Sequence, residues 1–297
     1  MPELPEVETT VRQLKRKALN RAFVGVWSDW KKIIKKPVDF SVFEKQLKGK
    51  KIKNIWRRAK NIIFDLSGGY SLLVHQKMTG HLLYGTWEDK GKIWMPVNNK
   101  NLEDPYNRFL HVIFFLDDGK MIALSDVRKF AKVELQETIN LKKDFEKLGP
   151  EPLDKDFTFE KFKKVLLWKN QPSPRLRHGK VKQVLMKPEI IAGIGNIYSS
   201  EILWQAKINP EKDVAKLNDL ELKLLYHAIK KILTLSIKLG GESFSDYRKP
   251  DGTKGNFDSV KKVYGRAGQQ CYRCKTKIQR IKIGQRSTFF CPNCQKS

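Results

Sequence analysis

The chain has 297 residues, enough for two domains, and 40% of them are hydrophobic, so we expect a globular protein with sizeable cores. Its formal charge of +27 comes from 59 lysines and arginines against 32 acidic residues. A surface this basic indicates a polyanionic partner, although a lineage rich in lysine would give the same charge. No apolar run approaches the roughly 18 residues that cross a bilayer, and the N-terminus lacks signal-peptide order. We therefore expect a cytoplasmic protein without a membrane partner.

A helix is predicted directly after Pro2 and Pro5, because apolar residues then recur on one face (Val7, Val11, Leu14 and Ala18). Proline suits a first helical turn, and Glu6 and Glu8 complement the positive end of the helix dipole. The N-terminal amine is therefore expected beside the start of a helix.

From about residue 22 to residue 135 the pattern changes to short apolar runs. Turn-forming glycines join two pairs of these runs: residues 61–66 with 71–75, and residues 111–116 with 121–124. The pattern predicts an antiparallel β-sandwich or barrel. Residues 136–155 are charged and contain proline, and we place a linker there.

After the linker the apolar spacing becomes helical. Asn218 and Glu221 form a predicted capping box, which opens a helix that ends at Gly240 and Gly241. Residues 242–260 are polar with little periodicity, a length that suits a mobile functional loop. Residues 191–198 form a glycine-containing turn before a helix; such a turn can bind an anion, or it can simply pack tightly.

The only four cysteines are Cys271, Cys274, Cys291 and Cys294, arranged as two CxxC pairs separated by 16 residues. This spacing predicts one structural Zn²⁺ bound by four thiolates, with a degenerate or redox pair as the alternative. Basic residues lie between the pairs, as in a small ribbon that rests on phosphates (Arg280, Lys282 and Arg286). Zinc ribbons also bind RNA or protein, so the ribbon alone does not identify the partner.

The opening string Met-Pro-Glu-Leu-Pro-Glu-Val-Glu-Thr resembles the start of formamidopyrimidine-DNA glycosylases. Further similarities follow in order along nearly the whole chain, at residues 57–60, 75–80, 126–130, 193–198, 240–246 and 262–266 and at the cysteines. The resemblance implies an α+β multidomain protein that binds DNA in a cleft. Its implied parts are an N-terminal antiparallel β-sandwich flanked by helices (1–135), the linker (136–155), a helix-two-turn-helix domain (156–241), a lesion-capping loop (242–260) and a zinc ribbon (261–297).

The implied function is that of a bifunctional DNA glycosylase and abasic-site lyase, acting as a monomer on nucleoid DNA. It would excise 8-oxoguanine and formamidopyrimidines from double-stranded DNA. After removal of Met1, Pro2 would attack the sugar and form a Schiff base, followed by β,δ-elimination. An α-amino group has a reference pKa of about 7.7 to 8.0, so a neutral nucleophilic fraction exists at neutral pH.

The resemblance also assigns roles to individual residues. Glu3 would protonate the sugar ring oxygen, Glu6 would help to position it, and Lys60 would grip phosphate at the lesion. The other implied DNA contacts are phosphate clamps (Lys182, Asn196 and Arg286) and side chains that fill the void left by the flipped base (Met78, Arg128 and Phe130). Without the resemblance, each residue has a more common structural explanation. An acidic residue at a helix start usually interacts with the helix dipole, a basic residue is usually solvated at the surface, and a Met or Phe usually belongs to the core.

The sequence departs from the family pattern at two places. The family's Asp-Pro-Arg-Arg-Phe-Gly is here Asp-Val-Arg-Lys-Phe-Ala at residues 126–131, and Gln76-Lys77 precedes Met78. Both places keep the inserting residue types, so the changes bear on the rigidity of the loop and its opposite-base stringency.

Two alternative functions remain. The first is an oxidised-pyrimidine, endonuclease VIII-like glycosylase on the same scaffold; such enzymes usually begin Pro-Glu-Gly-Pro, whereas this chain has Leu4 and Pro5. The second is a non-catalytic DNA- or RNA-binding zinc-ribbon protein. Such a protein would have no reason to keep Pro2, Glu3 and Glu6 together with Lys60.

Overall fold

The computed structural model describes residues 1–91, 93–167, 179–243 and 246–296. These residues form two compact units: Met1–Glu146 with Leu239–Asp258, and Lys147–Lys238 with Ser259–Ser297. Residues 168–178 of the predicted helix-two-turn-helix domain and residues 244–245 of the predicted capping loop lie outside the described residues. Among the described helices, none has the length and apolar composition that spanning a membrane requires.

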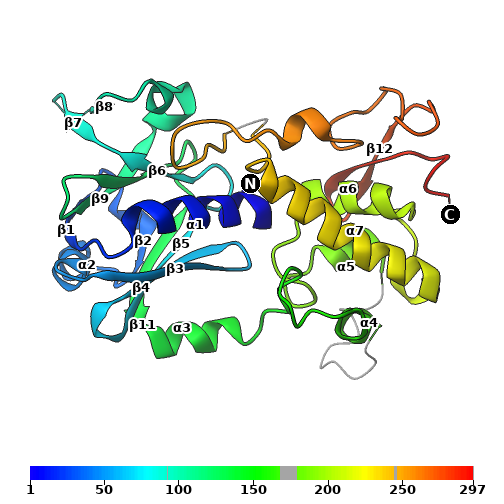
Figure 1. The fold of residues 1–297 in the computed structure, drawn as a ribbon, viewed down its shortest axis with the longest axis horizontal. Helices are drawn as coiled ribbons and strands as arrows, with labels where there is room; N and C mark the ends of the chain where they lie inside the picture. Colours follow the sequence, from blue (N-terminus) through cyan, green and yellow to red (C-terminus); the bar gives the residue numbers. More distant parts are fainter. Residues whose placement is uncertain (92, 168–178, 244–245, 297) are drawn as a thin grey trace. The chain divides into compact units, whose positions relative to one another are not determined.

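The first unit begins with helix α1 (Leu4–Ala18), at the predicted position (Figure 1). Pro5 lies in its first turn, where the missing N–H costs no helical hydrogen bond. The predicted apolar face of α1 is buried in the main core of the unit.

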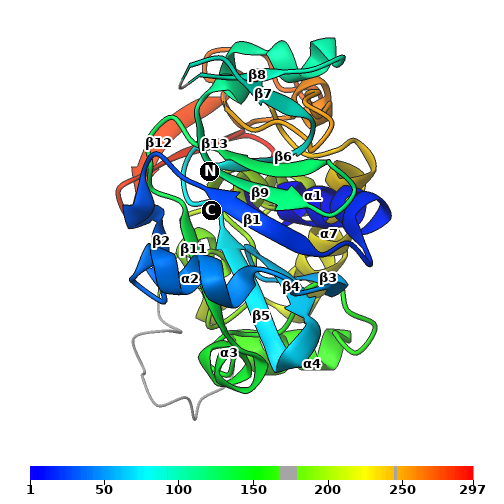
Figure 2. The same ribbon diagram turned by 90° about the vertical axis from the view of Figure 1, so that its left-hand side faces the viewer.

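Two sheets of the first unit share that core (Figure 2). The four-stranded sheet has the order β1 (Phe23–Trp27), β9 (Leu110–Leu116), β10 (Met121–Ser125) and β6 (His81–Gly85). The five-stranded sheet has the order β2 (Ile34–Lys36), β11 (Lys132–Glu137), β5 (Tyr70–His75), β4 (Asn61–Leu66) and β3 (Ile52–Arg58). Helix α1 contacts both sheets.

Both predicted hairpins are confirmed, β4 with β5 and β9 with β10. Their turns use glycines at positive φ, +76° at Gly68 and +75° at Gly119, a backbone region that other residues rarely adopt. The predicted antiparallel sandwich is confirmed, with one exception among the described strands: β2 and β11 pair in parallel. β2 has only three residues, too few for a sequence pattern to indicate a partner.

The first unit also contains elements that the sequence pattern did not indicate. These are helix α2 (Phe40–Leu47), capped by Asp39, and the short hairpin of β7 (Trp87–Asp89) and β8 (Trp94–Pro96). Helix α3 (Thr138–Phe145) lies where a linker was predicted. Its one buried residue, Leu141, packs against Ile63 and Leu73 of the five-stranded sheet. Phe145 packs against the same cluster, but Ile139 is exposed. Two apolar contacts in a helix of eight residues are too weak a signal for sequence analysis.

The second unit contains helices α4 (Phe159–Leu167), α5 (Val181–Leu185), α6 (Asn196–Ala206) and α7 (Asp219–Lys238), followed by the hairpin of β12 (Gln279–Ile283) and β13 (Arg286–Phe290). The predicted capping box of α7 is confirmed. Glu221 N donates to Asn218 Oδ1 at 2.9 Å, and Asn218 N donates to Glu221 Oε2 at 3.0 Å. Helix α6 packs against α7 and against β13.

Candidate active site and metal centre

Residues 2–6 are buried around the start of α1. Glu3 and Glu6 are each 2% exposed, and Pro2 is buried as well. Glu6 Oε2 accepts a hydrogen bond from Glu3 N at 2.7 Å, and Glu6 Oε1 accepts one from Glu242 N at 2.8 Å. One carboxylate therefore holds both the residue next to Pro2 and the start of a distant segment.

That segment, Leu239–Asp258, belongs to the first unit through several polar contacts. Gly241 has a φ of +83°, and a Cβ there would lie 2.8 Å from Glu6 Oε1, so a side chain would displace the carboxylate. Tyr247 donates its hydroxyl to Glu6 O at 3.0 Å, and burial raises the pKa of Tyr247, which keeps it a neutral donor. Arg248 pairs with Asp104 at 2.9 Å.

Lys60 lies in the β3–β4 turn, where Ala59 has a φ of +53°. Arg57 braces this turn: its Nη1 donates to Ala59 O at 3.0 Å, and its Nε pairs with Glu8 of α1 at 2.9 Å. Burial would raise the pKa of Glu8, but hydrogen bonds and charges from Arg12 and Arg57 outweigh it and hold that pKa below its usual value. The carboxylate therefore stays charged and connects the Lys60 turn to α1.

His75 lies at the end of β5, near these basic groups. Burial lowers the pKa of His75 to about 3, and the charges of Lys77, Lys132 and Lys60 contribute to the shift. Lys77 N donates to His75 Nδ1 at 3.0 Å, which requires that nitrogen to be unprotonated. His75 is therefore neutral at physiological pH and is not a phosphate-binding cation.

The three predicted void-filling residues lie on two turns of the first unit. Met78 is partly buried, whereas Arg128 is exposed and Phe130 is 52% exposed. The guanidinium carbon of Arg128 lies 4.5 Å from the centre of the Phe130 ring. Thr79 of the first turn hydrogen-bonds to Asp126 of the second, so the structure brings the two turns together.

The second unit contains the predicted phosphate clamps, and one differs from expectation. Lys182 is 0% exposed, and its Nζ donates to Asn196 O, Ser199 Oγ and Ser200 Oγ at 3.1, 3.0 and 2.7 Å. Burying an ammonium is costly unless it is hydrogen-bonded, which explains this arrangement. Lys182 thus organises the start of α6 and presents no exposed ammonium to a phosphate.

The other two predicted clamps lie near each other in the second unit. Asn196 Nδ2 donates to Ser287 O at 3.0 Å, which ties the start of α6 to the β12–β13 hairpin. Arg286, the neighbour of Ser287, is exposed. Sequence analysis missed Glu201, a buried residue of α6 whose carboxylate accepts N–H groups of Val263 and Tyr264 at 2.9 and 2.8 Å.

The four cysteines form the predicted metal centre. Their sulfur atoms all lie within 4.8 Å of one another, and a tetrahedral ion with Zn–S bonds of about 2.3 Å needs sulfurs about 3.8 Å apart. Trp204 Nε1 donates to Cys271 Sγ at 3.5 Å, a contact that orients the thiolate. The residues fit one structural Zn²⁺, and four thiolates leave it no open position for a substrate.

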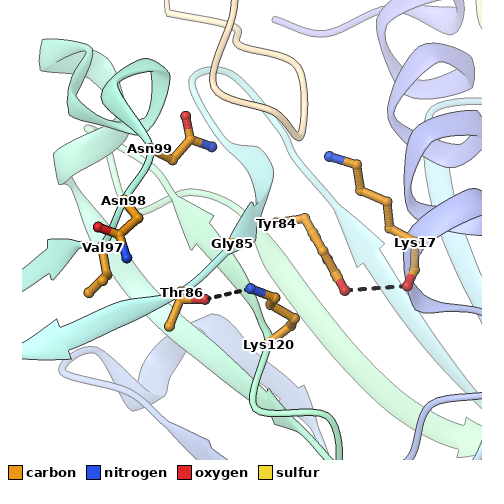
Figure 3. A pocket seen from close by; sticks show the side chains of 8 residues that line it. All are labelled: Lys17, Tyr84, Gly85, Thr86, Val97, Asn98, Asn99 and Lys120. Atoms are coloured by element: carbon orange, nitrogen blue, oxygen red, sulfur yellow. Dashed lines mark hydrogen bonds between the residues drawn. The ribbon is translucent and has the colours of Figure 1, made fainter.

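A separate cavity of about 360 Å³ lies in the first unit, where Lys17 marks the C-terminal end of α1 (Figure 3). Tyr84 donates its hydroxyl to Lys17 O at 3.3 Å, and Lys120 Nζ donates to Thr86 Oγ1 at 3.2 Å. The described lining contains neither a carboxylate nor any of the predicted site residues. This cavity is therefore not the candidate active site.

Family models match three parts of the chain. The formamidopyrimidine-DNA glycosylase N-terminal domain matches residues 1–133, the H2TH domain of the same enzymes matches residues 148–248, and the zinc finger found in FPG and IleRS matches residues 268–296. A formamidopyrimidine-DNA glycosylase of Pelotomaculum thermopropionicum is 38% identical over 298 residues, covering 100% of this chain and 99% of the relative. One from Lactococcus lactis subsp. cremoris is 35% identical, with both chains covered in full.

Solved structures agree with these matches. The Lactococcus lactis Fpg in complex with DNA containing an abasic site has a TM-score of 0.83 at 33% identity, covering 99% of this chain and 100% of that one. MutM bound to DNA with carbocyclic 8-oxo-G has a TM-score of 0.82 at 34% identity, with both chains covered in full. The fold, the four-thiolate centre and these matches define a zinc-containing DNA repair glycosylase. The chain belongs to the formamidopyrimidine-DNA glycosylase family.

Proposed function

We propose that this enzyme excises oxidised purines, namely 8-oxoguanine and formamidopyrimidines, from duplex DNA and then cleaves the abasic strand. We expect it to act as a monomer on nucleoid DNA in the cytoplasm. Relatives of similar length were solved with DNA containing an abasic site, Fapy-dG or an 8-oxo-G analogue, which supports this substrate class.

In the proposed reaction, Pro2 is the nucleophile once Met1 has been removed. Its lone pair forms a bond to C1′ of the damaged nucleotide, the bond from C1′ to the base breaks, and the amine proton passes to the departing base. Glu3 protonates the ring oxygen, which opens the sugar and leaves a cationic iminium at C1′. Loss of a 2′ proton then expels the 3′ phosphate, and a second elimination expels the 5′ phosphate.

The observation that carries the proposal is the double role of the Glu6 carboxylate at the start of α1. It binds the N–H of Glu3, the N-cap of α1, and Pro2 directly precedes that residue, so the amine and the acid are both held close to the start of one helix. Pre-positioned groups on a rigid element supply much of an enzyme's rate advantage. The braced turn of Lys60 in the same unit suits a grip on the lesion phosphate.

We further propose that Met78, Arg128 and Phe130 fill the space left by the flipped base. Flipping costs a few kcal/mol, which inserted side chains partly offset. An exposed Phe130 can enter the base stack, and the Arg128 guanidinium can hydrogen-bond the orphaned cytosine. Asn196 and Arg286 are proposed to hold phosphates from the second unit.

A panel of lesion duplexes tests the proposed function. Duplexes with 8-oxoguanine, a formamidopyrimidine, an oxidised pyrimidine or a preformed abasic site are incubated with the enzyme, and the strand products are separated on a gel. We expect preferential cutting of the two purine lesions, with phosphate left on both ends of the gap. Preferential cutting of the oxidised pyrimidine supports the alternative specificity, and failure to cut any duplex contradicts the proposal.

A further inference from the structure

Two turns of the first unit carry the proposed inserting side chains. Residues 76–80 form the Met78 turn, and residues 126–131 form the Arg128 turn. They meet through Thr79 and Asp126: the Thr79 hydroxyl donates to Asp126 Oδ1 and accepts from Arg128 N at 3.2 Å. A single hydroxyl thus touches the backbone of the residue that is proposed to read the opposite base.

The Asp126 carboxylate is 0% exposed and takes its partners from both turns. Its Oδ2 accepts from Ala131 N at 2.7 Å, and its Oδ1 lies 3.3 Å from Arg128 N. A buried carboxylate is costly unless its oxygens are hydrogen-bonded. Moving one turn away from the other would remove the Thr79 hydroxyl from Asp126 Oδ1 and leave only the bonds within the Arg128 turn. We name this hydrogen-bonded pair the Thr79–Asp126 joint.

The Arg128 turn has a second anchor on its other side. Lys129, at a φ of +56°, places its Nζ 4.9 Å from the centre of the Trp30 indole. Trp30 N in turn donates to Ser28 Oγ at 3.1 Å, which fixes the base of the indole. Loss of the joint should therefore loosen the turn without unfolding it.

We propose that Thr79 and Asp126 are positioning residues whose hydrogen bond fixes Arg128 relative to Met78 and thereby sets the opposite-base preference. The inference rests on the proposed function, in which Arg128 reads the orphaned base. An arginine distinguishes bases through the geometry of its donors, so its selectivity depends on how tightly its backbone is held.

The matched variants Thr79→Val and Thr79→Ser test the joint. Valine keeps the shape and removes the hydroxyl, whereas serine keeps the hydroxyl. The measurement is the single-turnover rate of 8-oxoguanine excision opposite cytosine divided by the rate opposite adenine. Misfolded protein cancels in this ratio. We expect Thr79→Val to lower the ratio by about threefold to tenfold, the net worth of one typical intramolecular hydrogen bond, and Thr79→Ser to keep it near the parent value.

Cleavage of a preformed abasic site provides a second readout. Because no base is excised there, Thr79→Val should change its rate much less than it changes the ratio. Asp126→Asn serves as a further variant: its amide places a donor where the carboxylate accepts, so the ratio should fall at least as far. Equal losses in the excision and abasic-site reactions, with an unchanged ratio, would show a merely structural role and overturn the inference.

Arg128→Ala, measured in parallel, separates this inference from the proposed function. If Arg128→Ala flattens the preference and Thr79→Val leaves it intact, only the joint is refuted. If Arg128→Ala itself keeps the parent preference for cytosine opposite the lesion, Arg128 does not read the opposite base. The proposed role of the Thr79–Asp126 joint is then refuted as well. If the double variant Thr79→Val/Arg128→Ala is no less selective than Arg128→Ala alone, Thr79 acts on selectivity through Arg128.

Discussion

Glu6 Oε1 lies 2.8 Å from the backbone nitrogen of Glu242, a residue that follows it by 236 positions. The other oxygen of the same carboxylate binds Glu3 N. Glu6 therefore couples the N-terminal end of α1, which carries the proposed nucleophile, to the segment Leu239–Asp258. A movement of that segment would therefore displace the Glu6 carboxylate and, through it, Glu3.

Glu6→Gln should weaken this coupling, because glutamine offers one acceptor oxygen where Glu6 uses two. One of the two N–H groups then faces an amide donor, which costs about 1 to 3 kcal/mol. We expect base excision to slow by at least about tenfold and amide hydrogen exchange to rise in Leu239–Asp258. The control is Glu103→Gln, at an exposed position of the same unit. Unchanged exchange in Glu6→Gln would contradict the coupling.

The sequence predicted those parts of the molecule that depend on local patterns. Short-range patterns encode the apolar face of α1, the Gly68 and Gly119 hairpins and the α7 capping box, and each is confirmed. The four-cysteine cluster is confirmed too, because its two short CxxC pairs have a spacing that is specific for one metal site. Resemblance to the family added the candidate site residues, whose order along the chain is visible without any structure.

Contacts between distant positions could not be predicted in this way. The parallel pairing of β2, the burial of Lys182 and the bond from Glu6 to Glu242 each join residues that no local pattern relates. Lys182 shows the difficulty, because nothing in the sequence of a lysine-rich chain distinguishes one buried lysine from the many exposed ones. Its burial follows from acceptors supplied by Asn196 and Ser200, which only the fold brings near.

Stability should fall as the pH drops below about 6.5, because two histidines, the buried His81 and the half-buried His75, stay neutral in the folded protein. Burial lowers the pKa of His75 to about 3 and that of His81 to about 4. Between these values and the unfolded pKa, the unfolded chain binds more protons, so stability is complete above pH 6.5 and is lost toward pH 4. Each histidine adds a slope of at most about 1.4 kcal/mol per pH unit.

Urea unfolding between pH 7.5 and 5 measures this slope. In His81→Gln, the dependence of the unfolding free energy on pH should be less steep by up to about 1.4 kcal/mol per pH unit, the contribution of one titrating group. Glutamine does not titrate, and it can keep the hydrogen bond to Asn107. A slope unaffected by this change would assign the pH dependence to other groups.

Cys291→Ser should abolish zinc binding, because the ion would keep only three thiolates. Metal content measured by atomic spectroscopy should approach zero, and affinity for lesion DNA should fall, since the β12–β13 hairpin that carries Arg286 is held by the same centre. Zinc-free protein that binds and cuts DNA normally would show that the centre is dispensable.

DNA affinity should depend steeply on salt, because each neutralised phosphate releases counterions. For about five phosphate contacts, the slope of log K against log salt should be roughly −4 to −5. Arg286→Ala should make the slope less negative by about 0.9. Lys182→Met should leave the slope unchanged while lowering stability, because the buried ammonium faces Asn196 and two serines. A change of slope in Lys182→Met would restore it as a phosphate contact.

The nucleophile can be identified by trapping, because only a Schiff base is reduced to a stable amine. Borohydride added during turnover should join the enzyme covalently to lesion DNA, and peptide mapping should place the adduct on Pro2. Retention of Met1 would make that nitrogen a tertiary amide without a usable lone pair, so a preparation that keeps Met1 should not trap. Mass spectrometry of the N-terminus checks this requirement directly.

Pro2→Gly and Glu3→Gln separate the two proposed chemical roles. Pro2→Gly should lower trapping and lyase activity by about a hundredfold, because a flexible primary amine replaces the fixed secondary amine, while lesion binding survives. Glu3→Gln should also keep binding, but it should suppress base excision more than cleavage of a preformed abasic site, because the acid acts on the sugar ring. An adduct on an internal lysine such as Lys60 would refute the proline mechanism, and the catalytic assignment would then have to be rebuilt around the β3–β4 turn.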